Sequence, residues 1–223
     1  MKCLLVLFVI VPMSVMAKSS QCFGTTSNGS VSDSVQLPQK GANFIIYHYL
    51  GHFLGRNYVH SKVAEVLLGA YEDLNQTHPK IMFKYAETGW KNGGTFKPHK
   101  THQNGLSVDF MVPVKNKKGQ SILFPTTISN KFGYSVEFDS RGNFNGFSID
   151  YEALGLHLVA LDKQAKKHGI GIKRVIFTPE LRKHLMHTSS NKYLKENMTF
   201  MKNKAWVRHD EHYHVDFEIN CKK

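Results

Sequence analysis

The 223-residue chain has no long hydrophobic run beyond its first residues. A transmembrane helix needs ~20 consecutive apolar residues. The apolar stretch at positions 4–13 is shorter than this, and no later segment approaches that length. The composition therefore argues against a membrane-spanning protein. No internal repeat is visible either.

The N-terminus has the pattern of a secretory signal peptide. Lys2 precedes the apolar stretch, and a short segment ending in Ala17 with small residues at the cleavage positions follows it. We expect residues 1–17 to be removed, which leaves a soluble, exported protein without a membrane anchor. The residues before Cys22 do not provide the context of a lipid-modified cysteine. The expected location is the periplasm, with secretion from the cell as the alternative.

Cysteine is scarce, with three residues in the whole chain. Cys3 leaves with the signal peptide, so the mature protein keeps only Cys22 and Cys221, close to its two ends. In an oxidising compartment such a pair is expected to form a disulfide that ties the termini together. The alternative is two unpaired thiols.

Acidic residues are also few, with 17 Asp and Glu against 29 Lys and Arg, which gives a formal charge of +12. A basic surface favours an anionic partner, such as nucleic acid, an acidic membrane face or a carboxylate-rich cell wall. The basic residues are scattered and no nucleic-acid recognition module is visible, so we expect no nucleic-acid partner. Export makes the cell wall the best fit.

The apolar fraction of 41% is enough for a real core. We expect a single domain over residues 41–223, preceded by an extended lead-in at residues 18–40 that is rich in Ser, Gly, Thr, Asn and Gln. Apolar residues recur with helical spacing at positions 63–74 and 150–168, and strand patterns occur at 81–85, 132–138 and 172–177. These patterns predict an α+β fold with a central antiparallel sheet flanked by helices.

The C-terminal segment carries the clearest functional signal. From Tyr213 to Ile219, apolar and polar residues alternate strictly, which predicts a strand with two different faces. His212, His214 and Asp216 share the polar face, because side chains two apart point the same way. Imidazoles backed by carboxylates make suitable inner and outer shells for a metal. The alternative is a solvated strand face.

A second group of polar residues lies at positions 99–110. Alternation from Leu106 to Phe110 predicts a strand with Asp109 on its polar face, entered through an Asn-Gly turn. His102 stands just before this turn, which can fold it back toward Asp109. The two strands together therefore predict one site.

A catalytic zinc ion usually takes three protein ligands and leaves a fourth position for water. His102, Asp109 and His214 supply two imidazoles and a carboxylate, while His212 on the same face can handle protons. His209 and His99 are candidates for supporting roles, and Glu211, Asp216 or Glu218 could orient an imidazole. From the residues alone, the division of the histidines between metal binding and catalysis stays open.

The two motifs resemble those of the penicillin-insensitive murein endopeptidases, zinc enzymes of the group that contains lysostaphin, D-Ala-D-Ala metallopeptidases and the hedgehog signalling domain. Residues 99–109, HKTHQNGLSVD, are similar to the family's H-x-x-H-Q-x-G-x-x-x-D. His209, His212 and His214 are similar to its H-x-x-H-x-H-V. The resemblance is strongest in these two motifs, which occur in the family's order.

The resemblance implies cleavage of the cross-bridge peptides of peptidoglycan. It also implies roles for six residues: zinc held by His102, Asp109 and His214, His212 as general base, and His209 and His99 as assisting groups. Two positions depart from the family, because Ser107 stands where an acidic residue is expected and Asp216 where an arginine is expected. The alternatives are a zinc D,D-carboxypeptidase or dipeptidase that trims stem peptides, a non-catalytic wall-binding protein, and a basic exported nuclease.

Overall fold

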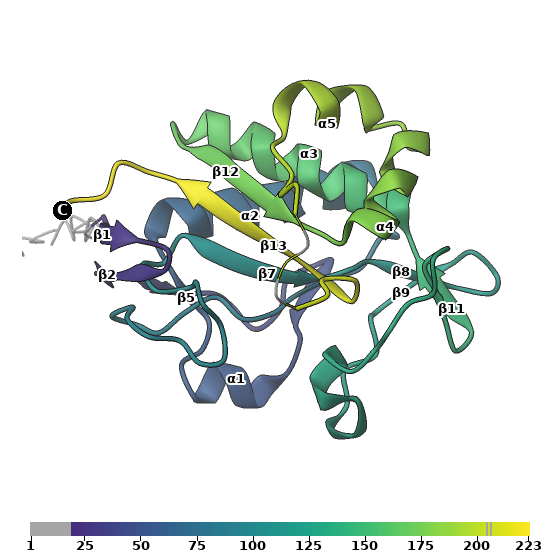
Figure 1. The fold of residues 1–223 in the computed structure, drawn as a ribbon, viewed down its shortest axis with the longest axis horizontal. Coiled ribbons are helices and arrows are strands. Elements are labelled where there is room, and N and C mark those ends of the chain that lie inside the picture. The colour runs from purple at the N-terminus through teal and green to yellow at the C-terminus, as the bar shows by residue number, and fades with distance from the viewer. Residues whose placement is uncertain (1–18, 204, 206) are drawn as a thin grey trace, which may run out of the picture.

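The computed structural model describes residues 19–203, 205 and 207–223. The signal peptide expected at residues 1–17 lies outside the described residues. The fold is α+β, as predicted, with helices packed against a five-stranded central sheet (Figure 1). Among the described residues, no helix combines the length and the apolar character needed to cross a membrane.

The central sheet brings the two motif strands together. Its strands lie in the order β12 (Gly171–Ile176), β13 (His212–Glu218), β7 (Ser107–Met111), β6 (Phe83–Tyr85) and β4 (Phe44–Ile46). All neighbouring strands are antiparallel except β4 and β6, which run parallel. Since β13 and β7 are neighbours in the middle of this sheet, side chains on their polar faces meet.

Two long helices cover the core face of the sheet. They are α2 (Ser61–Thr77) and α3 (Tyr151–Lys167), which confirms both helices expected from the apolar spacing. The Asp150 side chain caps α3 by accepting a hydrogen bond from the backbone of Ala153, as expected for a carboxylate before a helix. Tyr71 of α2 stacks on Phe44 of β4, with 4.4 Å between the ring centroids. The helices therefore bury the apolar side of the sheet and leave its other side for the polar residues.

The remaining elements are short. The helical ones are α1 (Tyr49–Phe53), η1 (Ile128–Gly133), α4 (Pro179–Arg182), η2 (Lys183–His187) and α5 (Asn191–Asn197). A four-stranded sheet contains, in order, β10 (Asn143–Phe144), β11 (Phe147–Ile149), β8 (Val114–Asn116) and β9 (Ser121–Ile122). This small sheet lies beyond one end of the central sheet (Figure 1).

The prediction of a strand at residues 132–138 is wrong. The 3-10 helix η1 ends at Gly133, residues 134–138 form a turn followed by an irregular segment, and Lys131 and Phe132 take left-handed conformations with φ of 51° and 57°. The Asn130 side chain accepts hydrogen bonds from the backbone of Thr127 and Gly133, and such local bonds compete with a strand ladder. The alternating aromatic pattern reflects burial of these residues against the core, not a pleated strand.

The N-terminal residues form a hairpin tied to the C-terminus. Strands β1 (Gln21–Thr25) and β2 (Asn28–Ser32) pair antiparallel, and β3 (Val35–Gln36) pairs with β5 (Tyr58–Val59). The expected disulfide between Cys22 and Cys221 is present, so β1 lies next to the C-terminus in Figure 1. The backbone N–H of Gln103 donates to the carbonyl of Thr26 at 3.0 Å. The hairpin therefore supports the loop that follows His102, while the proposed domain boundaries stay a prediction.

Candidate metal centre

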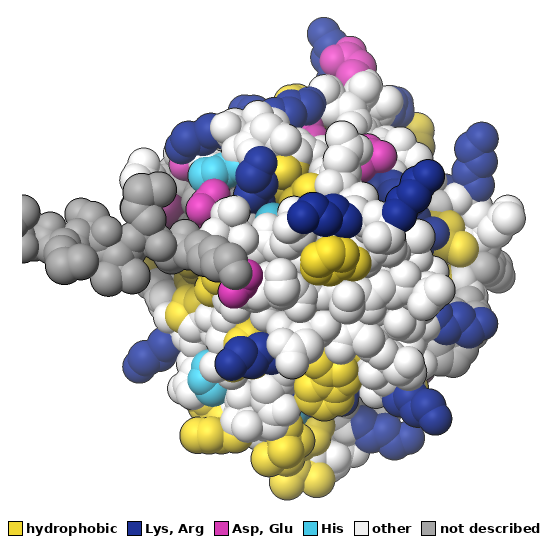
Figure 2. Space-filling view, turned by 90° about the vertical axis from the view of Figure 1, so that its left-hand side faces the viewer, with side chains coloured by type: hydrophobic (Ala, Val, Ile, Leu, Met, Phe, Trp, Pro, Cys, Tyr) yellow, Lys and Arg dark blue, Asp and Glu magenta, His cyan; other side chains and the backbone are white. Residues whose placement is uncertain are grey.

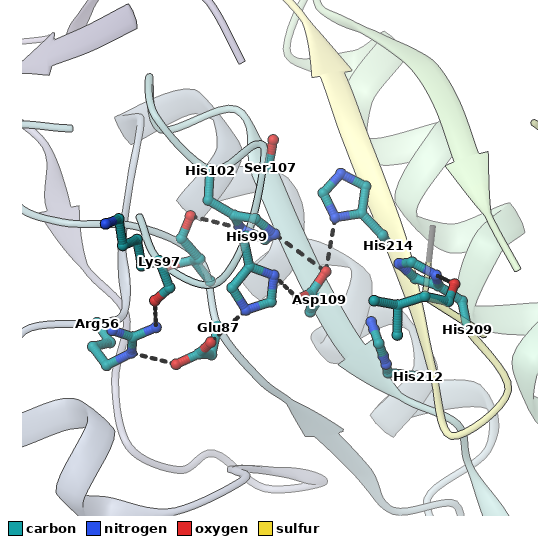
Figure 3. A network of polar contacts seen from close by, with 12 residues as sticks. Arg56, Glu87, Lys97, His99, His102, Ser107, Asp109, His209, His212 and His214 are labelled. Carbon is teal, nitrogen blue, oxygen red and sulfur yellow. Dashed lines mark hydrogen bonds and ion pairs between the residues drawn. The ribbon is translucent and has the colours of Figure 1, made fainter. Parts of the chain in front are cut away.

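The polar faces of β7 and β13 form the floor of the site (Figure 3). The two strands are paired antiparallel, and Asp109 lies directly opposite His214. Because alternate residues of a strand share a face, His212, His214 and Asp216 lie on one side of β13 while the apolar residues between them enter the core. Pairing of the strands thus joins two motifs that are about a hundred residues apart in the sequence.

His102 reaches this floor from the loop before β7. It has a left-handed φ of 70°, and the chain then bends through Gly105, whose φ is 76°. The Nδ1–H of His102 donates to the carbonyl of Thr88 at 3.0 Å. Its Nε2 then lies 3.3 Å from Oδ1 of Asp109, so the predicted return of His102 toward Asp109 is confirmed.

Asp109 is the central carboxylate of the site. Its Oδ1 accepts a hydrogen bond from Nδ1 of His214 at 2.8 Å, and its Oδ2 lies 3.6 Å from Nδ1 of His99. Asp109 is completely buried, and burial opposes its charge. The imidazoles around it, led by His102, outweigh this effect and hold the pKa of Asp109 well below its usual range. The carboxylate is therefore an anion in the middle of several imidazoles.

Glu87 supports His99 from the side. Its Oε2 lies 2.6 Å from Nε2 of His99, while its Oε1 accepts hydrogen bonds from Arg56 and from the Tyr47 hydroxyl. Burial raises the pKa of Glu87, but the bonds from His99 and Arg56 prevail and lower it to about 2. Glu87 thus remains ionised and fixes the orientation of His99.

His212 and His209 form a second pair of imidazoles, with ring centroids 4.5 Å apart. The Nδ1–H of His212 donates to Glu211 at 2.7 Å, and that of His209 donates to the carbonyl of Val207 at 2.8 Å. Burial alone would lower the pKa of His212, but the charge of Glu211 raises it. Burial, aided by the nearby His212, lowers the pKa of His209 to about 4. The two neighbours therefore have opposite protonation tendencies.

The far side of His214 is held by Asp216. Nε2 of His214 lies 2.7 Å from Oδ1 of Asp216, which also accepts a hydrogen bond from the Ser107 hydroxyl at 2.6 Å. Nε of Arg174 donates to the other oxygen at 2.6 Å. Ser107 and Asp216, the two residues expected to depart from the family pattern, face each other across β7 and β13. In this chain the acidic residue, Asp216, lies on β13, and the basic residue that pairs with it, Arg174, lies on the neighbouring strand β12.

A cleft of about 630 Å³ opens over these residues. Four of the site histidines line it, namely His99, His209, His212 and His214. The basic residues that line it are Arg56, Lys97, Lys100, Lys131 and Arg174, and Glu87 is the one acidic residue of its described lining. The cleft is therefore suited to an anionic ligand that reaches the histidines.

The site has the donors that a metal ion needs. The ligand atoms of His99, His102 and Asp109 all lie within 4.8 Å of one another, and His214 contacts the same carboxylate. Nε2 of His102 and Oδ2 of Asp109 are buried without a hydrogen-bond partner among the described residues, although buried polar atoms are normally paired. Imidazole nitrogen and carboxylate oxygen are common zinc ligands, so the donor set fits that ion.

The structure places all six residues that were predicted from the sequence at this site: His99, His102, Asp109, His209, His212 and His214. Of the carboxylates suggested as supports, Glu211 and Asp216 hold imidazoles, whereas Glu218 is exposed. Sequence reasoning missed Glu87 and Arg174. Glu87 follows β6 as an isolated acid, and Arg174 is one of many scattered basic residues, so neither had a distinguishing local pattern.

Comparison with known families agrees with this geometry. A model of the penicillin-insensitive murein endopeptidase family matches residues 22–223, which is nearly the whole chain and includes both histidine motifs. No curated protein sequence matches the chain significantly. With the two motifs assembled on paired strands and the match extending over the complete fold, the chain belongs to the penicillin-insensitive murein endopeptidase family, peptidases that act on the peptidoglycan of the cell wall.

Proposed function

We propose that the protein is an exported zinc metallopeptidase that hydrolyses the peptide cross-links of peptidoglycan. The observation that carries this proposal is the buried pair formed by His102 and Asp109, whose unpartnered ligand atoms lie beside His214 at the floor of a basic cleft. Family membership supplies the substrate class. The geometry supplies a place where the substrate and a metal ion would meet.

His102, Asp109 and His214 would hold the zinc ion. The bond from His102 to the Thr88 carbonyl places a proton on Nδ1 and leaves the lone pair of Nε2 for a metal. His214 presents Nδ1 toward Asp109, because Asp216 accepts a bond from its other nitrogen. When bound, zinc lowers the pKa of water to roughly 7 and polarises a carbonyl group. His99 is the alternative third ligand, since its ring nitrogen also approaches Asp109.

His212 is the proposed general base. Glu211 accepts the bond from Nδ1–H, which leaves Nε2 able to take a proton from the attacking water and to return it to the leaving amine. His209, adjacent to His212, and His99, held by Glu87, are placed to assist by hydrogen bonding to the reacting peptide, His209 as an acceptor because its proton lies on Nδ1. Each assisting ring lines the cleft and is anchored at its other nitrogen.

Export to the periplasm is part of the proposal. A disulfide between Cys22 and Cys221 supports an oxidising compartment. If residues 1–17 direct export, the protein recovered from the periplasm or the medium will have the mass of a chain that begins at Lys18 and carries one disulfide. Recovery of the full-length chain from the cytoplasm alone would contradict this part of the proposal.

The test of the activity is mass spectrometry of muropeptides from purified cross-linked sacculi. Mature protein is incubated with zinc, with a chelator, or as the His102→Ala variant. Conversion of cross-linked dimers to monomers only by the zinc-loaded wild type supports an endopeptidase, and the fragment masses identify the bond. Loss of terminal D-alanine with intact dimers would instead support a carboxypeptidase. Unchanged muropeptides in all samples would refute murein hydrolysis.

A nucleic-acid enzyme is less well supported. Lys and Arg side chains are dispersed over the face of the molecule in Figure 2 and do not gather in a continuous stripe. A protein that binds the phosphate backbone usually brings several basic groups together along one surface. The basic groups of the cleft surround the histidines instead, which favours a smaller anionic ligand such as a peptide.

A further inference from the structure

We propose that Arg174 is a specificity-determining residue that binds a carboxylate of the peptide substrate beside the candidate metal centre, and that Asp216 holds it in position. This inference rests on the proposed function, because it names the part of the peptide that the same cleft recognises. It concerns a residue outside the two histidine motifs. Its support comes from strand register, contacts and the charge of the cleft.

A β-bulge places Arg174 on the face of the site. In the ladder between β12 and β13, Ile172 pairs with Phe217, but Arg174 pairs with Asp216, so Lys173 is an extra residue. In a regular ladder Lys173 would lie opposite Asp216, and Arg174 would turn toward the core. Bulges re-aim side chains and are common beside active sites. The irregularity therefore brings the guanidinium of Arg174, and not the ammonium group of Lys173, next to the histidines.

The contacts of Arg174 leave donors for a ligand. Its Nε binds the buried carboxylate of Asp216 at 2.6 Å, and this is the one hydrogen bond of the guanidinium found among the described residues. The side chain is about one third exposed, at 36%, and lines the cleft. A guanidinium has five N–H donors in a planar fork that matches a carboxylate. The Nη groups are therefore available for a substrate carboxylate.

Asp216 fixes the guanidinium and a metal-ligand candidate together. One of its oxygens binds His214 and the Ser107 hydroxyl, while the other binds Arg174. A side chain that is already oriented loses less conformational freedom when it binds a ligand. The same carboxylate thus sets the spacing between the bound carboxylate of the substrate and the site of hydrolysis.

The charge of the cleft agrees with this assignment. Among its described lining residues, Glu87 is the one acid, and it is already paired with Arg56 and His99. Basic side chains from several segments also line the cleft. Peptides of peptidoglycan carry free carboxylates near the cross-link, so a fixed arginine beside the histidines provides a direct means to select them.

The experiment compares cross-linked muropeptide dimers that differ in one carboxylate, present either as the free acid or as the amide. Wild type, Arg174→Gln and Arg174→Lys are assayed for kcat and KM on each dimer. Lys173→Gln is the matched control, because it removes a positive charge from the adjacent, exposed position of the same strand. We expect wild type to prefer one free-acid dimer over its amide by roughly 10- to 100-fold in kcat/KM.

In Arg174→Gln this preference should disappear, mainly through a higher KM for the free-acid dimer. The amide dimer should lose less activity than the free-acid dimer, and Arg174→Lys should recover part of the preference. Lys173→Gln should behave as wild type. Calorimetric binding of the same dimers to the zinc-free proteins should show the same loss of discrimination, which a role in folding alone would not produce.

An equal loss of activity toward acid and amide dimers in Arg174→Gln would overturn the inference, since it would indicate a purely structural role. An unchanged preference would overturn it as well. Failure of wild type to cleave any dimer, with zinc bound, would refute the proposed function instead. Different results would therefore refute the role of Arg174 and the proposed peptidase function.

Discussion

The imidazoles of the site fall into two groups that differ in the partner of one ring nitrogen. Carboxylates hold one group, in the pairs His99 with Glu87, His212 with Glu211 and His214 with Asp216. Main-chain carbonyls hold the other, in the pairs His102 with Thr88 and His209 with Val207. A carbonyl fixes the neutral tautomer, whereas a carboxylate also favours the protonated ring.

The difference shows in the pKa values. Burial lowers the pKa of His102 and brings that of His209 to about 4. Burial acts in the same direction on His212 and His214, but Glu211 raises the pKa of the first, and Asp216 and Asp109 raise that of the second to about 10. The buried rings of His102, His212 and His214 thus have opposite protonation tendencies, which the partner of each ring decides.

The largest effect is expected from His102→Ala, which removes a carbonyl-held ring. Without this ligand the protein should lose stoichiometric zinc, and hydrolysis should fall by more than about 1000-fold, because the ion and the residues that act around it work as a unit. Zinc content and muropeptide release are measured on the same preparation. His168→Ala, which removes a partly exposed imidazole at the end of α3, is the control. Normal zinc content in His102→Ala would contradict the ligand role.

The next effect is expected from His212→Ala, which removes a carboxylate-held ring. Loss of a positioned proton-transfer group lowers the rate by ~100-fold or more, while zinc content should stay at the wild-type level. The rate and the zinc content of His212→Ala are measured beside those of His102→Ala, which compares a carboxylate-held imidazole with a carbonyl-held one. Loss of zinc together with activity would instead place His212 among the ligands.

Glu87→Gln tests the stabilising value of one carboxylate. The pKa of Glu87 in the folded protein is about 2, against an ordinary value of 4.5, so the ionised group stabilises the fold above about pH 4.5 and loses this effect as the pH falls toward 2. The variant should reduce the free energy of unfolding by about 3 kcal/mol at pH 7, and the difference should shrink in acid. Urea unfolding of the zinc-free proteins at several pH values measures it.

The exposed carboxylate Glu72 provides the control for that experiment. Glu72→Gln should change the free energy of unfolding by less than about 0.5 kcal/mol at every pH. A difference between wild type and Glu87→Gln that stays constant from pH 7 to pH 3 would show that packing, and not charge, accounts for the effect.

The smallest effect is expected from Glu211→Gln, which keeps an acceptor for His212 but removes its charge. Loss of such a supporting group costs roughly 10-fold in activity. Because Glu211 raises the pKa of His212, its removal lowers that pKa, and the acidic limb of the pH–rate profile should move to lower pH. A profile that only falls in height would show that Glu211 positions the ring without tuning it.

Local sequence patterns were sufficient to predict the regular helices and strands. The alternation along β13 and β7 and the apolar stripes of α2 and α3 were predicted correctly, because each is a repeat that one buried face imposes on the sequence. The alternation at residues 132–138 was misleading, since aromatic residues in an irregular segment were buried at every second position without a ladder. Asn130 and Gly133 determine that segment through local hydrogen bonds and backbone freedom.

Prediction of the candidate site from local sequence patterns was limited in the same way. Its six motif residues were recognisable because histidines and carboxylates recur at strand spacing and match a family pattern. Glu87 and Arg174 were not recognisable, because each is one of several similar charged residues and acquires its partner through tertiary packing. Arg174 depends in addition on a bulge that shifts its register by one residue.

The sequence by itself determined the membership of the family, the α+β class and the identity of the six motif residues of the site. Each of these follows from spacing along the chain. Only the tertiary structure decided which nitrogen of each imidazole is bound, and to what. Three of those pairings, His99 with Glu87, His102 with Thr88 and His214 with Asp109, join residues that are 12, 14 and 105 positions apart. The other partners lie within two residues of their histidine, but the orientation of each ring depends on packing, about which sequence spacing carries no information.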